Sequence, residues 1–185
     1  MPLCDKAQLR RDIRAAFPGA EARRRESQAL CGHILAWARY REARVVGGYI
    51  PMAREADIIP VLQDVWASGR ILALPRTEEP PYMTLRIVRG MEELETGRFG
   101  IPEPSEQAEI LPPEQLELLI VPLEGLSRQG VRLGKGGGYY DCLLARTRCF
   151  TLGAAMSWQW QLAIPCDPWD KPLQGAADQY GIHLF

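Results

Sequence analysis

The sequence predicts an α/β sandwich built around a mostly parallel β-sheet. Apolar runs of strand-like composition occur at 45–51, 71–76, 116–126 and 149–157, and segments with helical spacing lie before and between them. Strands that alternate with helices are typical of parallel sheets, because parallel neighbours need a crossover connection. A length of 185 residues suits one domain, and we expect the whole chain, 1–185, to form it.

Two helices are predicted before the first strand. Asp5 is placed to cap the first one, and Leu9 and Ile13 follow it at helical spacing. A Pro-Gly pair at 18–19 should end this helix. The second helix is predicted over 21–44, with one apolar stripe.

The middle of the chain continues the alternation. A third helix is expected between Asp57, as its cap, and Gly69, as its stop. The alternating segment 83–89 predicts a half-exposed strand, and the Glu-, Pro- and Gly-rich segment 91–116 predicts a long loop with one short helix. The strongest apolar run, 116–126, is the expected central strand.

A Gly-rich loop follows the expected central strand. After it we predict a helix over 139–148, a strand over 149–157, and a loop-rich tail over 159–185 with one short strand near its end. Ligands of parallel α/β proteins bind at the carboxyl ends of the strands. The loop after the central strand is therefore the expected place for the chemistry.

Composition excludes several classes of protein. The formal net charge of −1 argues against a dedicated nucleic-acid binder, and the two histidines, His33 and His183, are too few for a multi-histidine metal site. The five cysteines contain no CxxC pair, and we find neither a signal peptide nor an apolar run long enough to span a membrane. We expect a cytoplasmic monomer that acts on small molecules, with no nucleic-acid or membrane partner.

Charge is distributed unevenly. Residues 1–54 carry 11 basic and 5 acidic side chains, a net of +6, whereas 55–185 carry 11 and 18, a net of −7. The basic part either meets an anionic ligand or forms solvated helical faces, and charge alone favours the solvated faces.

The Gly-rich loop has the features of a phosphate-binding site. Arg132 and Lys135 flank glycines at 134 and 136–138, and a helix is predicted directly afterwards. Backbone N–H groups of glycines can approach an anion closely, and a helix N-terminus adds a partial positive charge. The order of residues matches neither a Walker A loop nor a dinucleotide fingerprint. A flexible surface turn is the alternative, but it does not explain the two cations.

Asp141 begins the helix after this loop. An acid there either favours the helix dipole or binds Mg²⁺, which typically uses one or two carboxylates together with phosphate oxygens. Local sequence does not separate the two roles.

The stretch 132–141, Arg-Leu-Gly-Lys-Gly-Gly-Gly-Tyr-Tyr-Asp, resembles the signature of the 5-formyltetrahydrofolate cyclo-ligase family. Further segments resemble family motifs in the same order: Lys6-x-x-Leu9-Arg10, Tyr49-x-Pro51-x-x-x-Glu55-x-Asp57, Leu74-Pro75-Arg76, Gly100-Ile101-x-Glu103-Pro104 and Pro165-x-x-x-Trp169-Asp170-x-Pro172-Leu173. The resemblance covers nearly the whole chain.

The resemblance implies a three-layer, Rossmann-like α/β sandwich and an ATP- and Mg²⁺-dependent ligase of one-carbon metabolism. In the family, ATP phosphorylates the formyl oxygen of 5-formyltetrahydrofolate. A neighbouring nitrogen then closes onto that carbon and phosphate leaves. The products are 5,10-methenyltetrahydrofolate, ADP and phosphate.

The resemblance also implies roles for individual residues. The expected ATP-binding residues are Lys6, Arg10, Arg132, Gly134, Lys135, Gly136, Gly137, Gly138, Tyr139 and Tyr140. Arg132, Lys135 and Tyr140 are the expected catalytic residues. Lys6 and Arg10 share one helix face because they are four residues apart, although without the motif they would read as a pair of solvated cations.

The implied folate contacts are Glu55, Phe99 and Tyr140. A carboxylate suits the paired N–H donors of a pterin edge, and an aromatic ring packs on a planar ligand. An exposed loop acid and an ordinary apolar anchor are the alternatives for Glu55 and Phe99. Asp141 and Asp170 are the implied Mg²⁺ ligands, with a turn cap as the alternative for Asp170.

Two positions depart from the family pattern. Ile58 replaces a threonine, and Cys142 replaces an arginine beside the phosphate loop. Two other functions stay open. One is a family-shaped protein that binds nucleotide or folate without turnover, which loss of the loop glycines or of Asp141 would favour, and both are intact. The other is an ATP-dependent kinase or ligase that acts on another small substrate, which only the Ile58 departure favours.

Overall fold

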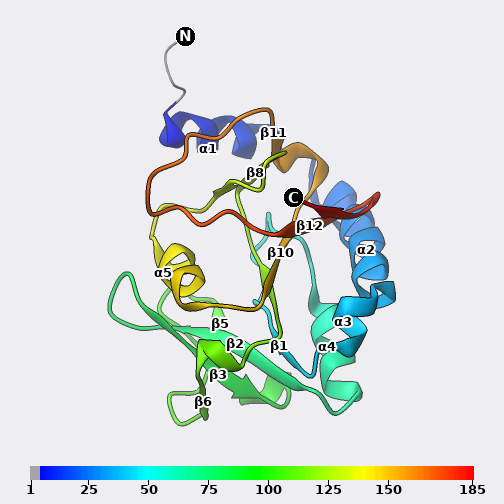
Figure 1. Cartoon of the computed structure of the whole chain (residues 1–185), viewed down its shortest axis with the longest axis vertical. Helices are drawn as coiled ribbons and strands as arrows, with labels where there is room; N and C mark the ends of the chain where they lie inside the picture. Colours follow the sequence, from blue (N-terminus) through cyan, green and yellow to red (C-terminus); the bar gives the residue numbers. More distant parts are fainter. Residues whose placement is uncertain (1–4) are drawn as a thin grey trace.

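The computed structural model describes residues 5–185 and has an eight-stranded sheet at its centre, in the order β13-β12-β10-β7-β1-β2-β3-β6 (Figure 1). Its strands are β1 (Val45–Gly47), β2 (Ile71–Thr77), β3 (Met83–Val88), β6 (Ile110–Leu111), β7 (Leu118–Val121), β10 (Phe150–Ala154), β12 (Gly175–Asp178) and β13 (Gly181–Leu184). The block from β12 to β2 is parallel throughout, while β13, β3 and β6 pair antiparallel at the edges. The predicted mostly parallel sheet is confirmed.

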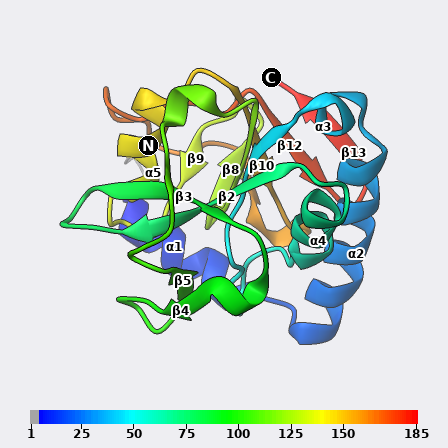
Figure 2. The ribbon, with the colours of Figure 1, turned by 90° about the horizontal axis from the view of Figure 1, so that it is seen from below.

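Helices cover both faces of the sheet, as the three-layer prediction requires. One face packs against α2 (Ala20–Ala36), α3 (Ala38–Glu42) and α4 (Ile59–Ala67), and the other against α5 (Tyr139–Arg146) (Figures 1 and 2). Along β7, Leu118 and Ile120 enter the first core and Leu119 and Val121 the second. All four are fully buried, and each such side chain contributes about 1.5–3 kcal/mol to folding.

The first helix, α1 (Lys6–Ala15), is capped as predicted. The Asp5 side chain accepts a hydrogen bond from the backbone N–H of Ala7 at 3.2 Å. Leu9 and Ile13 are its buried residues. The helix ends at Ala15, ahead of the Pro-Gly pair that follows.

The prediction of one helix over 21–44 is wrong, because the chain breaks at Trp37 into α2 and α3. Trp37 has an extended backbone (φ −75°, ψ 127°), and its ring packs edge-to-face on Phe150 at 5.3 Å. A straight helix of that length would be about 36 Å long. The break instead lets the chain turn back over the sheet.

The cap of α4 also differs from the prediction. Ile58 occupies the cap position and Asp57 precedes it, although its carboxylate accepts a hydrogen bond from Ile59 N at 3.2 Å. Gly69, at φ +69°, ends the helix region as expected.

The central strand is shorter than the predicted 116–126. It divides after Val121 because Pro122 has no N–H to continue the ladder. The chain then forms β8 (Gly125–Ser127), which pairs in a separate sheet with β9 (Arg132–Leu133) and β11 (Trp160–Gln161). Strand β1 is likewise shorter than predicted over 45–51, and β10 is shorter than predicted over 149–157.

Two segments contain more structure than predicted. The predicted loop 91–116 forms a hairpin of β4 (Leu94–Thr96) and β5 (Pro102–Pro104), the edge strand β6, and 3₁₀ turns at Met91–Glu93 and Pro113–Gln115. The tail contains β11, β12 and β13 rather than one strand. Prolines in β5 and small residues in β12 lower their strand propensity, and β6 and β11 have only two residues each, so local pattern does not reveal them.

Within residues 5–185, no helix combines the length and the apolar character that crossing a bilayer requires. Cys4 lies outside the described residues. The other four cysteines are free thiols, and burial raises the pKa of Cys31 and of Cys149 to about 12.

Candidate active site

A cavity of about 590 Å³ opens at the carboxyl ends of the parallel strands. Residues that follow β1 and β7, together with the end of β2, form its base, and α1 and the loop 134–138 contribute to its walls. Every site residue predicted from the sequence lines it: Lys6, Arg10, Glu55, Phe99, Arg132, Gly134, Lys135, Gly136, Gly137, Gly138, Tyr139, Tyr140, Asp141 and Asp170. The structure therefore brings all of them together, while their individual roles remain predictions.

The Gly-rich loop connects β9 to α5 and needs its glycines. Gly136 and Gly138 have φ values of +106° and +72°, which side-chain-bearing residues rarely adopt. A Cβ at Gly134 would lie 2.8 Å from the Arg132 guanidinium, and one at Gly137 would lie 2.8 Å from the Tyr139 ring. The loop backbone therefore faces the cavity directly, beside the N-terminus of α5.

Helix α1 lies against this loop through its cations. Arg10 Nε donates a hydrogen bond to the carbonyl oxygen of Gly134 at 2.7 Å. Lys6 Nζ lies 2.6 Å from a carboxylate oxygen of Asp167 and 2.6 Å from one of Asp170. Burial lowers the pKa of Lys6, but the two carboxylates outweigh that effect and raise it. Lys6 is thus a firmly charged group between two acids.

Arg132 and Asp141 form an ion pair at the start of α5. Arg132 Nη2 lies 2.7 Å from Asp141 Oδ1, and the Arg132 side chain is 5% exposed. The guanidinium carbon is 5.6 Å from the centre of the Tyr140 ring. Within residues 5–185, Arg132 Nε is buried without a hydrogen-bond partner.

Glu55 and Lys135 also form an ion pair, with Oε1 and Nζ 2.6 Å apart. The other carboxylate oxygen of Glu55 accepts a hydrogen bond from Met52 N at 2.8 Å, and Arg23 Nε donates to the Glu55 carbonyl at 2.6 Å. Glu55 was predicted to contact folate and Lys135 to contact ATP. Their pairing marks the boundary between the two predicted subsites.

Tyr140 is partly buried beside this boundary. Burial raises its pKa far above the ordinary value, and the nearby Glu55 charge raises it further, against the opposing effect of Arg132. Tyr140 is therefore a neutral hydrogen-bonding group rather than a phenolate base.

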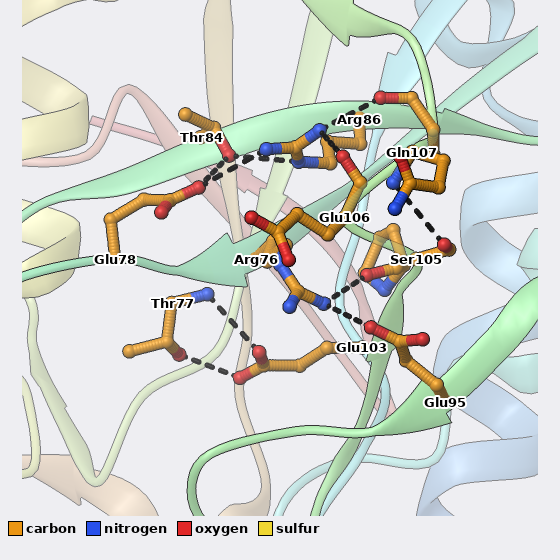
Figure 3. Close-up of polar contacts among 12 residues, drawn as sticks. Arg76, Thr77, Glu78, Thr84, Arg86, Glu95, Glu103, Ser105, Glu106 and Gln107 are labelled. Atoms are coloured by element: carbon orange, nitrogen blue, oxygen red, sulfur yellow. Dashed lines mark hydrogen bonds and ion pairs between the residues drawn. The ribbon is translucent and has the colours of Figure 1, made fainter.

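The β4–β5 hairpin builds a second wall of the cavity. Figure 3 shows Glu103 reaching back to Thr77 of β2: its carboxylate accepts hydrogen bonds from Thr77 Oγ1 at 2.6 Å and Thr77 N at 3.2 Å. Arg76 joins both strands of the hairpin, with 2.7 Å bonds to Glu95 and to the carbonyl of Pro104.

The hairpin loop carries Phe99 to the cavity. The Phe99 ring packs edge-to-face on the Tyr139 ring, with centroids 6.1 Å apart, and it remains 58% exposed. Pro75, Met83 and Ile101 give this side of the cavity an apolar surface. An exposed aromatic ring beside apolar side chains suits a planar ring ligand.

Several lining residues were not singled out from the sequence as site residues. They are Glu103, Glu124, Asp167, Trp169 and Thr77. Glu103 and Trp169 stand in segments that resemble family motifs, so the sequence could have identified these two as site residues. The sequence carries no such signal for Glu124 and Asp167, because only the folded chain places them beside cations of α1.

Known proteins are similar to this chain over most of its length. The model of the 5-formyltetrahydrofolate cyclo-ligase family matches residues 3–177. The 5-formyltetrahydrofolate cyclo-ligase of Mus musculus is 28% identical over 181 residues, which cover 91% of this chain and 88% of that protein. The cyclo-ligase of Haemophilus influenzae is 28% identical over 169 residues, which cover 88% and 90% of the two chains.

Solved structures are also similar. The 5,10-methenyltetrahydrofolate synthetase of Aquifex aeolicus superposes with a TM-score of 0.84 at 29% identity, over 97% of this chain and 92% of that one. The synthetase of Mycoplasma pneumoniae has a TM-score of 0.76, over 95% and 99% of the two chains; at 18% identity it supports the fold alone. The chain belongs to the 5-formyltetrahydrofolate cyclo-ligase family.

Proposed function

We propose that this chain catalyses the ATP-dependent cyclisation of 5-formyltetrahydrofolate to 5,10-methenyltetrahydrofolate, with release of ADP and phosphate. The formyl oxygen attacks the terminal phosphorus of ATP, and ADP leaves. The neighbouring nitrogen of the folate then bonds to the activated carbon and loses its proton, and the carbon–oxygen bond breaks as phosphate departs. Family membership supports this reaction, and one observation in the structure carries it: a single cavity joins a cationic glycine loop to an apolar, aromatic wall.

The glycine-loop side of the cavity is the proposed ATP site. Arg10, Arg132 and Lys135 surround the loop 134–138, and the N-terminus of α5 adds backbone donors. Phosphoryl transfer is catalysed mainly by positioning and by neutralisation of charge, which these groups supply. The neutral Tyr140 is the proposed donor at the junction of the two substrates.

Asp141 and Asp170 are the proposed ligands of Mg²⁺. One oxygen of each carboxylate is bound to a cation or a backbone N–H, and in the described part of the chain the other oxygen makes no hydrogen bond. No three metal-ligating side chains cluster within residues 5–185, so phosphate oxygens and water would complete the shell. When bound, Mg²⁺ would neutralise charge on the phosphates.

The hairpin side of the cavity is the proposed folate site. Phe99 would pack on a planar ring, and Glu55 would accept hydrogen bonds from N–H donors of the pterin. Neither departure from the family pattern lines the cavity: Ile58 is fully buried in the core between sheet and helices, and Cys142 is absent from the lining. We further propose that the protein works as a cytoplasmic monomer.

One assay tests the proposal. Purified protein is mixed with Mg·ATP and 5-formyltetrahydrofolate, and the absorbance of the methenyl product is followed. We expect product formation that requires both ATP and Mg²⁺. Clear ATP binding without product would favour a binding protein without turnover and overturn the proposed reaction.

A further inference from the structure

Helix α1 carries a third cation on the face that meets the cavity. Lys6, Arg10 and Arg14 are spaced four residues apart, so they follow one side of the helix. Each one bonds to a different segment of the site. Lys6 meets Asp167 and Asp170, Arg10 meets the Gly134 carbonyl, and Arg14 meets Glu124. The family motif accounts for the first two cations but not for the third.

The Arg14–Glu124 contact is a two-point ion pair. Arg14 Nε lies 2.9 Å from Oε1 and Nη2 lies 3.3 Å from Oε2. The Glu124 side chain is 9% exposed, and its backbone N–H donates to the Leu133 carbonyl at 2.8 Å. Glu124 is therefore fixed to the β8–β9 unit from which the glycine loop emerges, and a bidentate guanidinium–carboxylate pair fixes orientation as well as distance.

The apolar side of α1 docks at the same place. Ile13 approaches Gly125 so closely that a Cβ there would lie 2.7 Å from Ile13 Cδ1. Leu9 and Ile13 pack with Leu133 and Ile164 in a small cluster of their own. Because this cluster is small, polar contacts must supply much of the orientation of the helix.

Without Arg14, the carboxylate of Glu124 would be unfavourable at this position. It lines a cavity that would hold a triphosphate, and an unpaired carboxylate there would repel the ligand. A buried carboxylate beside an anion site must be paired with a cation, and the pair is expected to serve a structural purpose. Arg14 is that cation, and the contacts indicate that the purpose of the pair is to dock α1.

We infer that Arg14 and Glu124 form a positioning pair that holds α1 against the glycine loop, so that Lys6 and Arg10 face the phosphates of ATP. The inference rests on the proposed ATP site. Neither residue takes part in the chemistry; the pair acts through the other two cations.

Glu124→Gln tests the positioning pair, because the inference and the alternative predict opposite changes in the KM for ATP. If Glu124 were only a nearby negative charge, removing that charge would lower the KM for ATP. If the pair positions α1, the KM for ATP rises, by about fivefold, with kcat and the KM for the folate nearly unchanged. A fall in the KM for ATP would overturn the inference.

Variants of the arginine provide the matched controls. Arg14→Ala should raise the KM for ATP as Glu124→Gln does, and Arg14→Lys, which keeps the charge but not the two-point geometry, should lie between it and the wild type. Arg11→Ala is the control on the same helix, because the Arg11 side chain bonds only to Gln8 within residues 5–185. An Arg11 effect equal to that of Arg14 would overturn the inference.

Amide exchange of α1 separates this inference from the proposed function. Without nucleotide, the amides of residues 7–16 should exchange faster in Arg14→Ala and Glu124→Gln than in the wild type and Arg11→Ala. Unchanged exchange together with an unchanged KM for ATP would refute the positioning pair while leaving the reaction intact. A wild-type protein that makes no product would refute the reaction, and the exchange result would still report on the pair.

Discussion

The two walls of the cavity are assembled in different ways. The glycine-loop wall comes from ten consecutive residues, 132–141, whose spacing already specifies a turn, a helix start and flanking cations. The hairpin wall is collected from β2, β3 and the segment 94–108, and it is held by side chains that bridge distant positions, such as Thr77 with Glu103 (Figure 3).

The two walls also differ in the kind of side chain that they present to the cavity. The loop wall carries the charges that phosphoryl transfer needs, whereas the hairpin wall carries few charges toward the cavity and presents Phe99 and apolar side chains. Changes in the loop wall should therefore affect turnover and ATP, and changes in the hairpin wall should affect the folate. Each prediction below tests that division, from the largest expected effect to the smallest.

Asp141→Ala should reduce kcat by about 100-fold or more, because it removes a proposed metal ligand and the partner of the buried Arg132. Steady-state rates at saturating substrates measure the effect, and titration with Mg²⁺ tests its cause. Near-normal kcat in this variant would remove Asp141 from the metal site.

Glu55→Gln should raise the KM for the folate about tenfold and the KM for ATP less. The amide still fits the space and accepts from Met52 N, but it loses the charge that faces Lys135. Initial rates with each substrate varied in turn give the comparison. Glu114→Gln is a suitable control, because the Glu114 side chain is exposed and lies outside both the cavity lining and the hairpin.

A larger rise in the KM for ATP than for the folate would contradict this placement of Glu55. The residue would then belong to the loop wall, as a partner that positions Lys135. Both residues of the Glu55–Lys135 ion pair would then be assigned to the ATP site.

Thr77→Val should raise the KM for the folate about threefold and lower the free energy of unfolding by about 1 kcal/mol. Valine keeps the shape and the backbone donor to Glu103 but removes the 2.6 Å hydroxyl bond. Kinetics and urea unfolding measure the two effects. Thr147→Val, which removes a 2.9 Å hydroxyl bond to the Leu143 carbonyl outside the cavity lining, should leave the KM for the folate unchanged.

Tyr140→Phe should lower kcat about threefold without changing the shape of the pH profile between about pH 6 and 9. Burial raises the pKa of Tyr140 far above its ordinary value of 10.0, so the phenol stays protonated over this range. Its ionisation would weaken the fold only as the pH rises above that ordinary value. An ionisation that is present in the wild-type profile and absent from this variant would show that Tyr140 titrates during turnover.

Much of the fold could be predicted from the sequence where local pattern and packing agree. The Asp5 cap, the buried strands around 45, 71, 118 and 150, and the helix after the glycine loop were all predicted. Predictions failed where packing overrode helix preference at Trp37 and where the proline inside an apolar run was not taken as the end of the strand. Trp37 leaves the helix to reach Phe150, and Pro122 diverts the chain from the central sheet into a second one.

The sequence by itself determined the glycine loop with its flanking cations and the motifs whose candidate residues line the site, because these are local patterns with few alternatives. Only the tertiary structure decided how they pair: Lys6 between Asp167 and Asp170, Lys135 with Glu55, Arg14 with Glu124 and Glu103 with Thr77. The physical reason is that backbone conformation depends on neighbours along the chain. The partner of a charged side chain depends instead on distances that exist only after the sheet has brought remote segments together.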